Sequence, residues 1–69
     1  MSNHVYKIIQ LAGSSSTSIE DAVQTAIAKA GKTVRNPDWF SIAETRGLIK
    51  DGKVANYQVV LNVGFTLDD

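Results

Sequence analysis

The chain has 69 residues, of which 43% are hydrophobic and 20% are charged. This length suits one domain spanning residues 1–69, and the composition is that of an ordinary soluble globular protein rather than a disordered chain. Seven Lys and Arg residues balance seven Asp and Glu residues, so the chain has no strongly basic field that would hold nucleic acid or an anionic membrane.

Cysteine is absent, which excludes a disulfide framework, a cysteine-ligated zinc site and thiolate catalysis. A domain this small buries only about 60% of the surface that its unfolded chain exposes. We therefore expect self-association to supplement its core. The first residues lack the cationic and apolar segments of a signal peptide, and the apolar stretches are too short to span a membrane. These features predict a cytoplasmic protein.

The first predicted element is a strand over Val5–Ala12, which is rich in β-branched and aromatic residues. Gly13 and the serine run after it are expected to end this strand. The next segment has apolar residues at helical spacing and predicts a helix of roughly five turns. Its apolar stripe consists of Ile19, Ala22, Val23, Ala26, Ile27, Ala30 and Val34.

The predicted helix begins somewhere between Ser15 and Ser18, since any of these hydroxyl groups could cap it, and Thr17 with Glu20 has capping-box spacing. The dipeptide Asn36-Pro37 is expected to end it, because the residue before proline avoids helical geometry.

Two long strands are predicted over Trp39–Ile49 and Val54–Leu67, with Asp51-Gly52 between them as a type I′ hairpin turn. The predicted fold is therefore α+β, a β-α-β-β protomer whose three-stranded antiparallel sheet packs around one helix. Without a β-bulge, the turn sets a register. The expected pairs are Thr45 with Gln58, Ala43 with Val60, Ser41 with Asn62, and Trp39 with Gly64.

The hairpin register produces two unlike faces. One is apolar enough to pack on the helix and consists of Phe40, Ile42, Leu48, Tyr57, Val59, Leu61, Val63, Phe65 and Leu67. The other is mixed and consists of Trp39, Ser41, Ala43, Thr45, Gln58, Val60 and Asn62. The mixed face requires a partner or a ligand to explain it.

The sequence contains no recognisable catalytic constellation. Its one histidine, His4, lies near the terminus, and Glu20-Asp21 fits the first turn of a helix, where negative charge complements the helix dipole. Asp68-Asp69 is expected to be a solvated tail. Gly13–Ser16 is weakly similar to a phosphate-binding turn but lacks the P-loop lysine, so helix capping is favoured. We expect neither an enzyme nor a metal site.

Three side chains are candidates for binding. Trp39, the only tryptophan, is a platform for a planar ring or an anchor in an oligomer interface. Gln58 can donate and accept together, as the imide-like edge of a heterocycle requires, or it is simply solvated. The alternation of side chains along the strand predicts that Arg46 lies on the helix-side face. There its charge either extends to solvent, binds an anion or forms a salt bridge with Glu44.

Read together, several short motifs resemble those of the dodecins, small flavin-binding proteins of bacteria and archaea. The resemblance spans nearly the whole chain. It rests on the joint spacing of the motifs Asp38-Trp39-Phe40, Thr45-Arg46-Gly47, Tyr57-Gln58-Val59 and Val63-Gly64-Phe65, with the opening Val5-Tyr6-Lys7 and the helix end Lys32-Thr33-Val34-Arg35.

The resemblance implies twelve β-α-β-β protomers in a hollow shell that stores or buffers flavins without catalysis. It implies stacking of paired flavins between Trp39 side chains of neighbouring subunits, a bond from Gln58 to the pyrimidine edge of the ring, and contributions from Arg46 and Asp38. The ligands so implied are FMN or riboflavin, with FAD as a further candidate, and some bacterial members also bind coenzyme A. Thr66 departs from the arginine that is frequent in bacterial relatives. The alternative function is a structural homo-oligomer without a small-molecule ligand.

Overall fold

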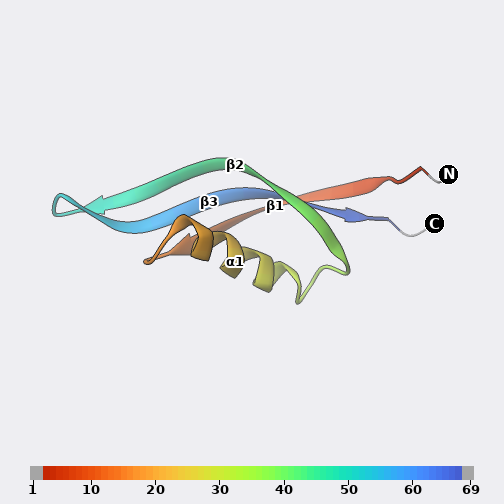
Figure 1. The fold of residues 1–69 in the computed structure, drawn as a ribbon, viewed down its shortest axis with the longest axis horizontal. Coiled ribbons are helices and arrows are strands. Elements are labelled where there is room, and N and C mark those ends of the chain that lie inside the picture. The colour runs from red at the N-terminus through yellow and green to blue at the C-terminus, as the bar shows by residue number, and fades with distance from the viewer. Residues whose placement is uncertain (1–2, 68–69) are drawn as a thin grey trace.

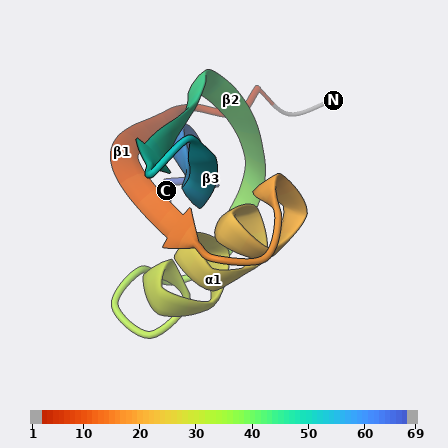
Figure 2. The same ribbon diagram turned by 90° about the vertical axis from the view of Figure 1, so that its left-hand side faces the viewer.

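The computed structural model describes residues 3–67. Strand β1 spans Tyr6–Ser15, helix α1 spans Ile19–Ala30, strand β2 spans Pro37–Lys50 and strand β3 spans Lys53–Thr66. The strands form one antiparallel sheet in the order β1-β3-β2, with the long β2–β3 hairpin extending beyond the helix (Figure 1). Seen along its length, the sheet curves so that β1 and β2 arch from β3 towards α1 (Figure 2). The predicted α+β fold with β-α-β-β order is confirmed.

Helix α1 is shorter than its apolar stripe predicts. It begins after Ser18, whose hydroxyl oxygen accepts a hydrogen bond from the Asp21 N–H at 3.0 Å, within the expected range of cap positions. It ends at Ala30, where Gly31 is the cap and the chain tightens into turns. The helix is thus about three turns long, and the prediction that it continues to Asn36-Pro37 is wrong. A glycine costs a helix about 1 kcal/mol relative to alanine, which favours an early end.

Strand β1 continues through Gly13 to Ser15, so the prediction that Gly13 ends it is wrong. A Cβ atom on Gly13 would lie 2.5 Å from the Ala22 carbonyl oxygen and 2.9 Å from the Ala26 Cβ. The glycine is therefore a contact point at which α1 approaches the strand backbone closely, and not a strand breaker.

The core lies between α1 and the helix-side face of β3. Val59, Leu61 and Val63 of β3 are completely buried, and they pack with the small residues Ala22 and Ala26 of α1. This confirms the predicted helix-side face for β3. On β2 the prediction is only partly correct. Phe40 and Ile42 lie opposite the buried Val63 and Leu61 but remain about half exposed. The assignment of Leu48 to this face is wrong, because an irregular register places it opposite Asn56, on the other face of the sheet. Helix α1 packs mainly on β1 and β3.

The hairpin turn has the predicted conformation, with positive φ at Asp51 (54°) and Gly52 (75°). Its register is altered by three irregularities, between Pro37 and Trp39, between Ile42 and Glu44, and between Leu48 and Ile49. The irregularity next to the turn adds one residue to β3, and the one at Ala43 adds one residue to β2.

The second shift cancels the first, so only the stretch between them leaves the predicted register. Trp39 pairs with Gly64 and Ser41 with Asn62, as predicted. The predicted pairs of Thr45 with Gln58 and of Ala43 with Val60 are wrong. The observed partners are Arg46 for Gln58 and Glu44 for Val60.

Candidate functional site

The first part of the candidate site is an aromatic platform on the β2–β3 pair. The indole of Trp39 lies directly on Gly64, where a Cβ atom would collide with three carbons of the ring. The next pair along, Phe40 with Val63, faces the helix, so alternation places Trp39 on the opposite face. Trp39 is 38% exposed, and the Tyr6 ring contacts it edge-on with centroids 5.9 Å apart. In the single chain, the indole is therefore fixed by Gly64 and Tyr6 but remains partly exposed to solvent.

Asp38 anchors this platform. It is the extra residue in β2 between the Pro37–Phe65 and Trp39–Gly64 pairs. Its Oδ2 accepts a hydrogen bond from the Thr66 N–H at 3.1 Å and another from the Thr66 hydroxyl. The carboxylate thus links the start of β2 to the end of β3 beside the indole. Sequence reasoning assigned Asp38 to the site but missed Thr66 as its partner.

The second part of the site joins Arg46 of β2 to Gln58 of β3. The Arg46 Nε donates a hydrogen bond to the Gln58 Oε1 at 2.9 Å. The prediction that Arg46 lies on the helix-side face is wrong, because the shifted register sets it directly opposite Gln58. The expected ion pair with Glu44 is present at 3.5 Å, with both side chains more than half exposed. An ion pair so exposed contributes about 0–1 kcal/mol to stability.

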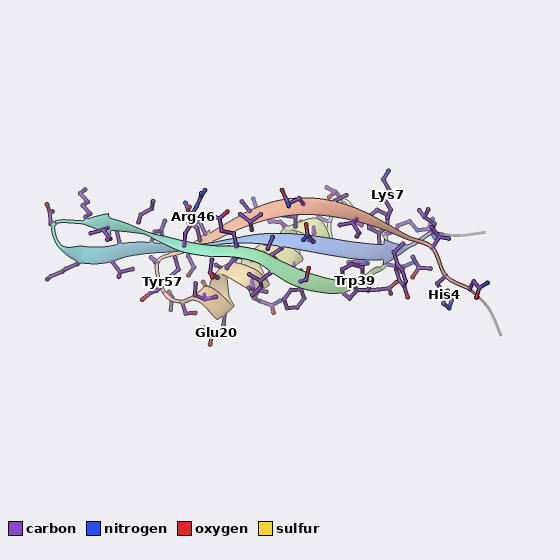
Figure 3. All side chains as sticks on the ribbon, turned by 90° about the horizontal axis from the view of Figure 1, so that it is seen from above. His4, Lys7, Glu20, Trp39, Arg46 and Tyr57 are labelled. Atoms are coloured by element: carbon purple, nitrogen blue, oxygen red, sulfur yellow. The ribbon has the colours of Figure 1, made fainter. Side chains whose placement is uncertain are left out.

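The two parts of the site lie far apart within one chain (Figure 3). Trp39 pairs with Gly64, six residues from Gln58 along β3. At about 3.3 Å per residue, the backbone positions that carry the indole and the amide are therefore separated by about 20 Å along the strands. The fold brings Asp38 to Trp39 and Arg46 to Gln58, but it does not bring the two pairs together.

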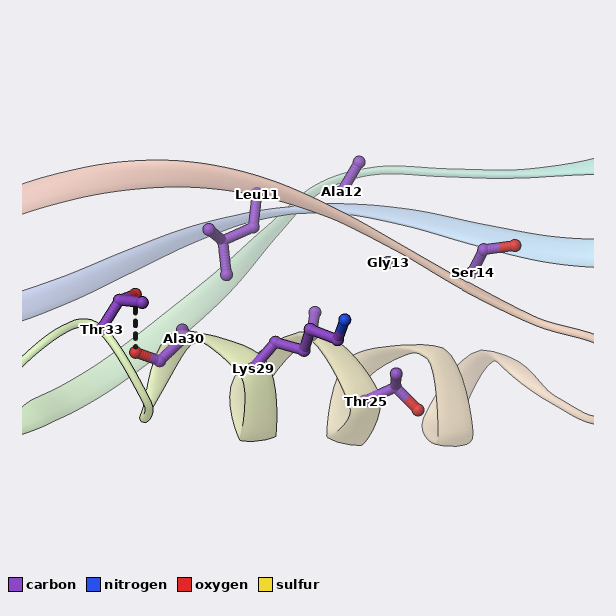
Figure 4. A pocket seen from close by; sticks show the side chains of 9 residues that line it. Leu11, Ala12, Gly13, Ser14, Thr25, Lys29, Ala30 and Thr33 are labelled. Carbon is purple, nitrogen blue, oxygen red and sulfur yellow. Dashed lines mark hydrogen bonds between the residues drawn. The ribbon is translucent and has the colours of Figure 1, made fainter.

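Two sizeable cavities within residues 3–67 are lined by other residues. One of about 410 Å³ lies between β1 and α1, where Gly13, Lys29 and Thr33 line it (Figure 4). Another, of about 380 Å³, lies between α1 and β2 and is mostly apolar, with Val23, Ile27 and Phe40 in its wall. Trp39 and Asp38 border a smaller hollow of about 100 Å³. The candidate residues therefore lie on an open surface of the single chain.

Gly64 is a residue of the candidate site that sequence reasoning overlooked. The signal was a glycine inside a strand, opposite the only tryptophan in the predicted register. Such a glycine often marks a close approach. The structure supplies the reason for it here, because any side chain would occupy the place of the indole.

Within residues 3–67, no group of three or more His, Cys, Asp or Glu side chains could hold a metal ion. In the same range, no helix is long and apolar enough to cross a membrane. The predicted solvated tail, Asp68-Asp69, lies outside the described residues.

Fold and site together define a small β-α-β-β protein with an exposed aromatic platform on its sheet, and known proteins share this fold. The Dodecin family matches residues 5–68. A dodecin from Thermus thermophilus is 49% identical over 65 residues, which are 94% of each chain.

Solved structures agree with the sequence comparison. The dodecin from Streptomyces coelicolor superposes with a TM-score of 0.91 at 42% identity, covering 100% of this chain and 99% of its own. The dodecin from Streptomyces davaonensis gives 0.90 at 40% identity, covering 99% and 100%. The chain belongs to the dodecin family, and this membership supports the formation of an oligomer.

Proposed function

We propose that the protein binds flavin, FMN or riboflavin, by stacking the isoalloxazine ring on Trp39. The observation that carries this proposal is the state of the indole, which is held against Gly64 and anchored beside Asp38, yet is 38% exposed. A fixed aromatic plane with one open side suits a flat tricyclic ring. Aromatic stacking contributes about 0.5–1.5 kcal/mol beyond the burial of area.

Gln58 is the proposed polar contact for the pyrimidine edge of the ring. Because about 20 Å separates it from Trp39 within one chain, one ring cannot contact both in the same subunit. Each site therefore takes its indole from one subunit and its amide from another. Binding and assembly are then coupled, and ligand stabilises the oligomer by mass action.

The proposed assembly is a closed shell of twelve identical chains. The single chain exposes apolar side chains along β2 and at the hairpin end, as a protomer with a large interface does. They are Phe40, Ile42, Leu48, Ile49 and Val54. A closed assembly would cover them and would also bring Trp39 of one subunit within reach of another.

The proposed role is the storage and buffering of flavin in the cytoplasm, without catalysis. Sequestering a ring requires a plane to stack on and a polar contact, both of which the site offers, and requires no general acid or base. FAD and coenzyme A are further candidate ligands for the same test. A purely structural homo-oligomer is the alternative that the exposed apolar residues of β2 also fit.

The deciding experiment combines native mass measurement with titration of riboflavin, FMN, FAD and coenzyme A. We expect a homododecamer that quenches the fluorescence of riboflavin or FMN and turns yellow when loaded. A folded monomer or dimer at neutral pH would contradict the shell. A dodecamer that leaves every flavin fluorescent would support the structural alternative instead.

A further inference from the structure

The contact between Arg46 and Gln58 determines which atoms the glutamine offers to a ligand. A guanidinium group only donates hydrogen bonds, whereas a glutamine amide has one accepting and one donating end. The Arg46 Nε is 2.9 Å from the Gln58 Oε1. The reverse orientation of the amide would place its NH₂ group against the guanidinium, with two donors facing each other. The arginine therefore selects the orientation in which Nε2 is free.

The irregular register is what creates this contact. In the regular register predicted from the turn, Thr45 faces Gln58 and Arg46 points to the other side of the sheet. The extra residue beside the hairpin turn shifts β3 by one position, so that Arg46 and Gln58 become direct cross-strand partners. Such partners have Cβ atoms about 4.5–5.5 Å apart, within reach of a side-chain hydrogen bond. Glu44, 3.5 Å from the other end of the guanidinium, restrains it further.

We propose that Arg46 is a positioning residue, which holds the Gln58 amide so that Nε2 points to a hydrogen-bond acceptor of the ligand. For the flavin of the proposed function, on which this inference rests, that acceptor is a carbonyl oxygen of the pyrimidine edge. Gln58 is half-buried in β3 and presents its donor with its rotamer already chosen. Because the side chain is already ordered before the ligand arrives, the entropic cost of binding is smaller.

A double-mutant cycle with riboflavin tests the role of Arg46, because riboflavin has no phosphate that the guanidinium could contact. We expect Arg46→Ala to weaken riboflavin binding by about tenfold, a typical consequence of losing one hydrogen bond of this kind. In a Gln58→Ala background, the same change should have no further effect. Equal losses in both backgrounds would overturn the proposal, since Arg46 would then act independently of Gln58.

A second, isosteric variant tests the polarity of the amide. In Gln58→Glu, a carboxylate accepts from Arg46 as the amide oxygen does, but no donor remains for the ligand. We expect a loss of riboflavin affinity at least as large as that of Gln58→Ala. Wild-type affinity in Gln58→Glu would show that the ligand donates to this side chain, and would overturn the assigned orientation.

Two controls accompany the cycle. Lys53→Ala removes one exposed positive charge from the same hairpin without touching the amide, and should leave riboflavin affinity unchanged. Arg46→Met retains the aliphatic stem and serves where Arg46→Ala does not assemble. If the wild-type protein binds no riboflavin, both the proposed function and this inference fail. If it binds riboflavin and the losses are additive, only the inference fails.

Discussion

The two ends of the candidate site are built in different ways. The aromatic end rests on backbone, because the indole of Trp39 lies on Gly64 and the strand ends are joined by the Asp38 carboxylate. The amide end consists of side chains that hold one another, Arg46 and Gln58, at a place where the register has shifted. The aromatic end is therefore sensitive to added volume beneath the indole, because a Cβ atom on Gly64 would collide with the ring. The amide end is sensitive instead to the loss of a hydrogen-bond donor or acceptor.

The largest expected effect follows from removing the platform itself. Trp39→Ala should abolish most flavin affinity while leaving the assembly intact, because stacking is the main contribution of this side chain in the proposed function. Flavin titration measures the affinity, and light scattering measures the assembly. If the tryptophan is instead an interface anchor, the variant will dissociate, and the aromatic end will have been assigned the wrong role.

A slightly smaller loss of flavin affinity is expected from Gly64→Ala. This variant retains the indole of Trp39, but the new methyl group occupies the space on the sheet where the indole lies. The added Cβ would collide with the ring. Overpacking of this kind typically costs about 1–3 kcal/mol of stability, and the displaced indole should bind flavin poorly. Denaturant unfolding and flavin titration report the two losses separately.

Gly31→Ala is the matched control for Gly64→Ala. The Gly31 backbone is in the right-handed helical region, and the nearest atoms to an added Cβ lie at an ordinary 3.5 Å. This substitution should not lower stability, and can raise it by up to about 1 kcal/mol because alanine favours the helical backbone, and it should leave flavin affinity close to that of the wild type. Wild-type flavin affinity in Gly64→Ala would show that flavin binding does not depend on the contact between the indole and Gly64.

Mixed assemblies test whether Trp39 of one subunit and Gln58 of another bind the same flavin. We expect shells refolded from Trp39→Ala and Gln58→Ala chains to contain a minority of tight flavin sites, although neither pure variant has any. Those sites would unite both wild-type side chains in trans. If verified mixed shells contain no tight sites, the two residues do not share a ring across subunits.

The smallest effect is expected at the anchor of the aromatic end. Thr66→Val removes the hydroxyl donor to Asp38 but preserves the backbone bond, and should lower the free energy of unfolding by about 0.5–1.5 kcal/mol. Thermal or denaturant unfolding measures this loss. Thr45→Val, at an exposed position of β2, is the control. Equal effects of the two variants would show that the Asp38–Thr66 link does not stabilise the chain.

The sequence alone was sufficient for most of the fold. Periodicity and turn chemistry act over a few residues, so they predicted the helix, the strands and the Asp51-Gly52 turn. The pairing of Trp39 with Gly64 was also correct, because the two register shifts between the turn and this pair cancel. The residue types at Trp39 and Gln58 also led to the hypothesis of a stacking platform and an amide contact, which the titrations proposed above will test.

Only the tertiary structure decided where Arg46 points and what Gly13 does. An extra strand residue is accommodated wherever the twist and packing of the whole sheet permit, and no local pattern marks that place. Gly13 has the sequence character of a strand end, but α1 packs on it, so its role depends on an element that follows it in the chain. Local chemistry thus determined the elements and the kinds of contact, whereas long-range packing determined which side chains meet.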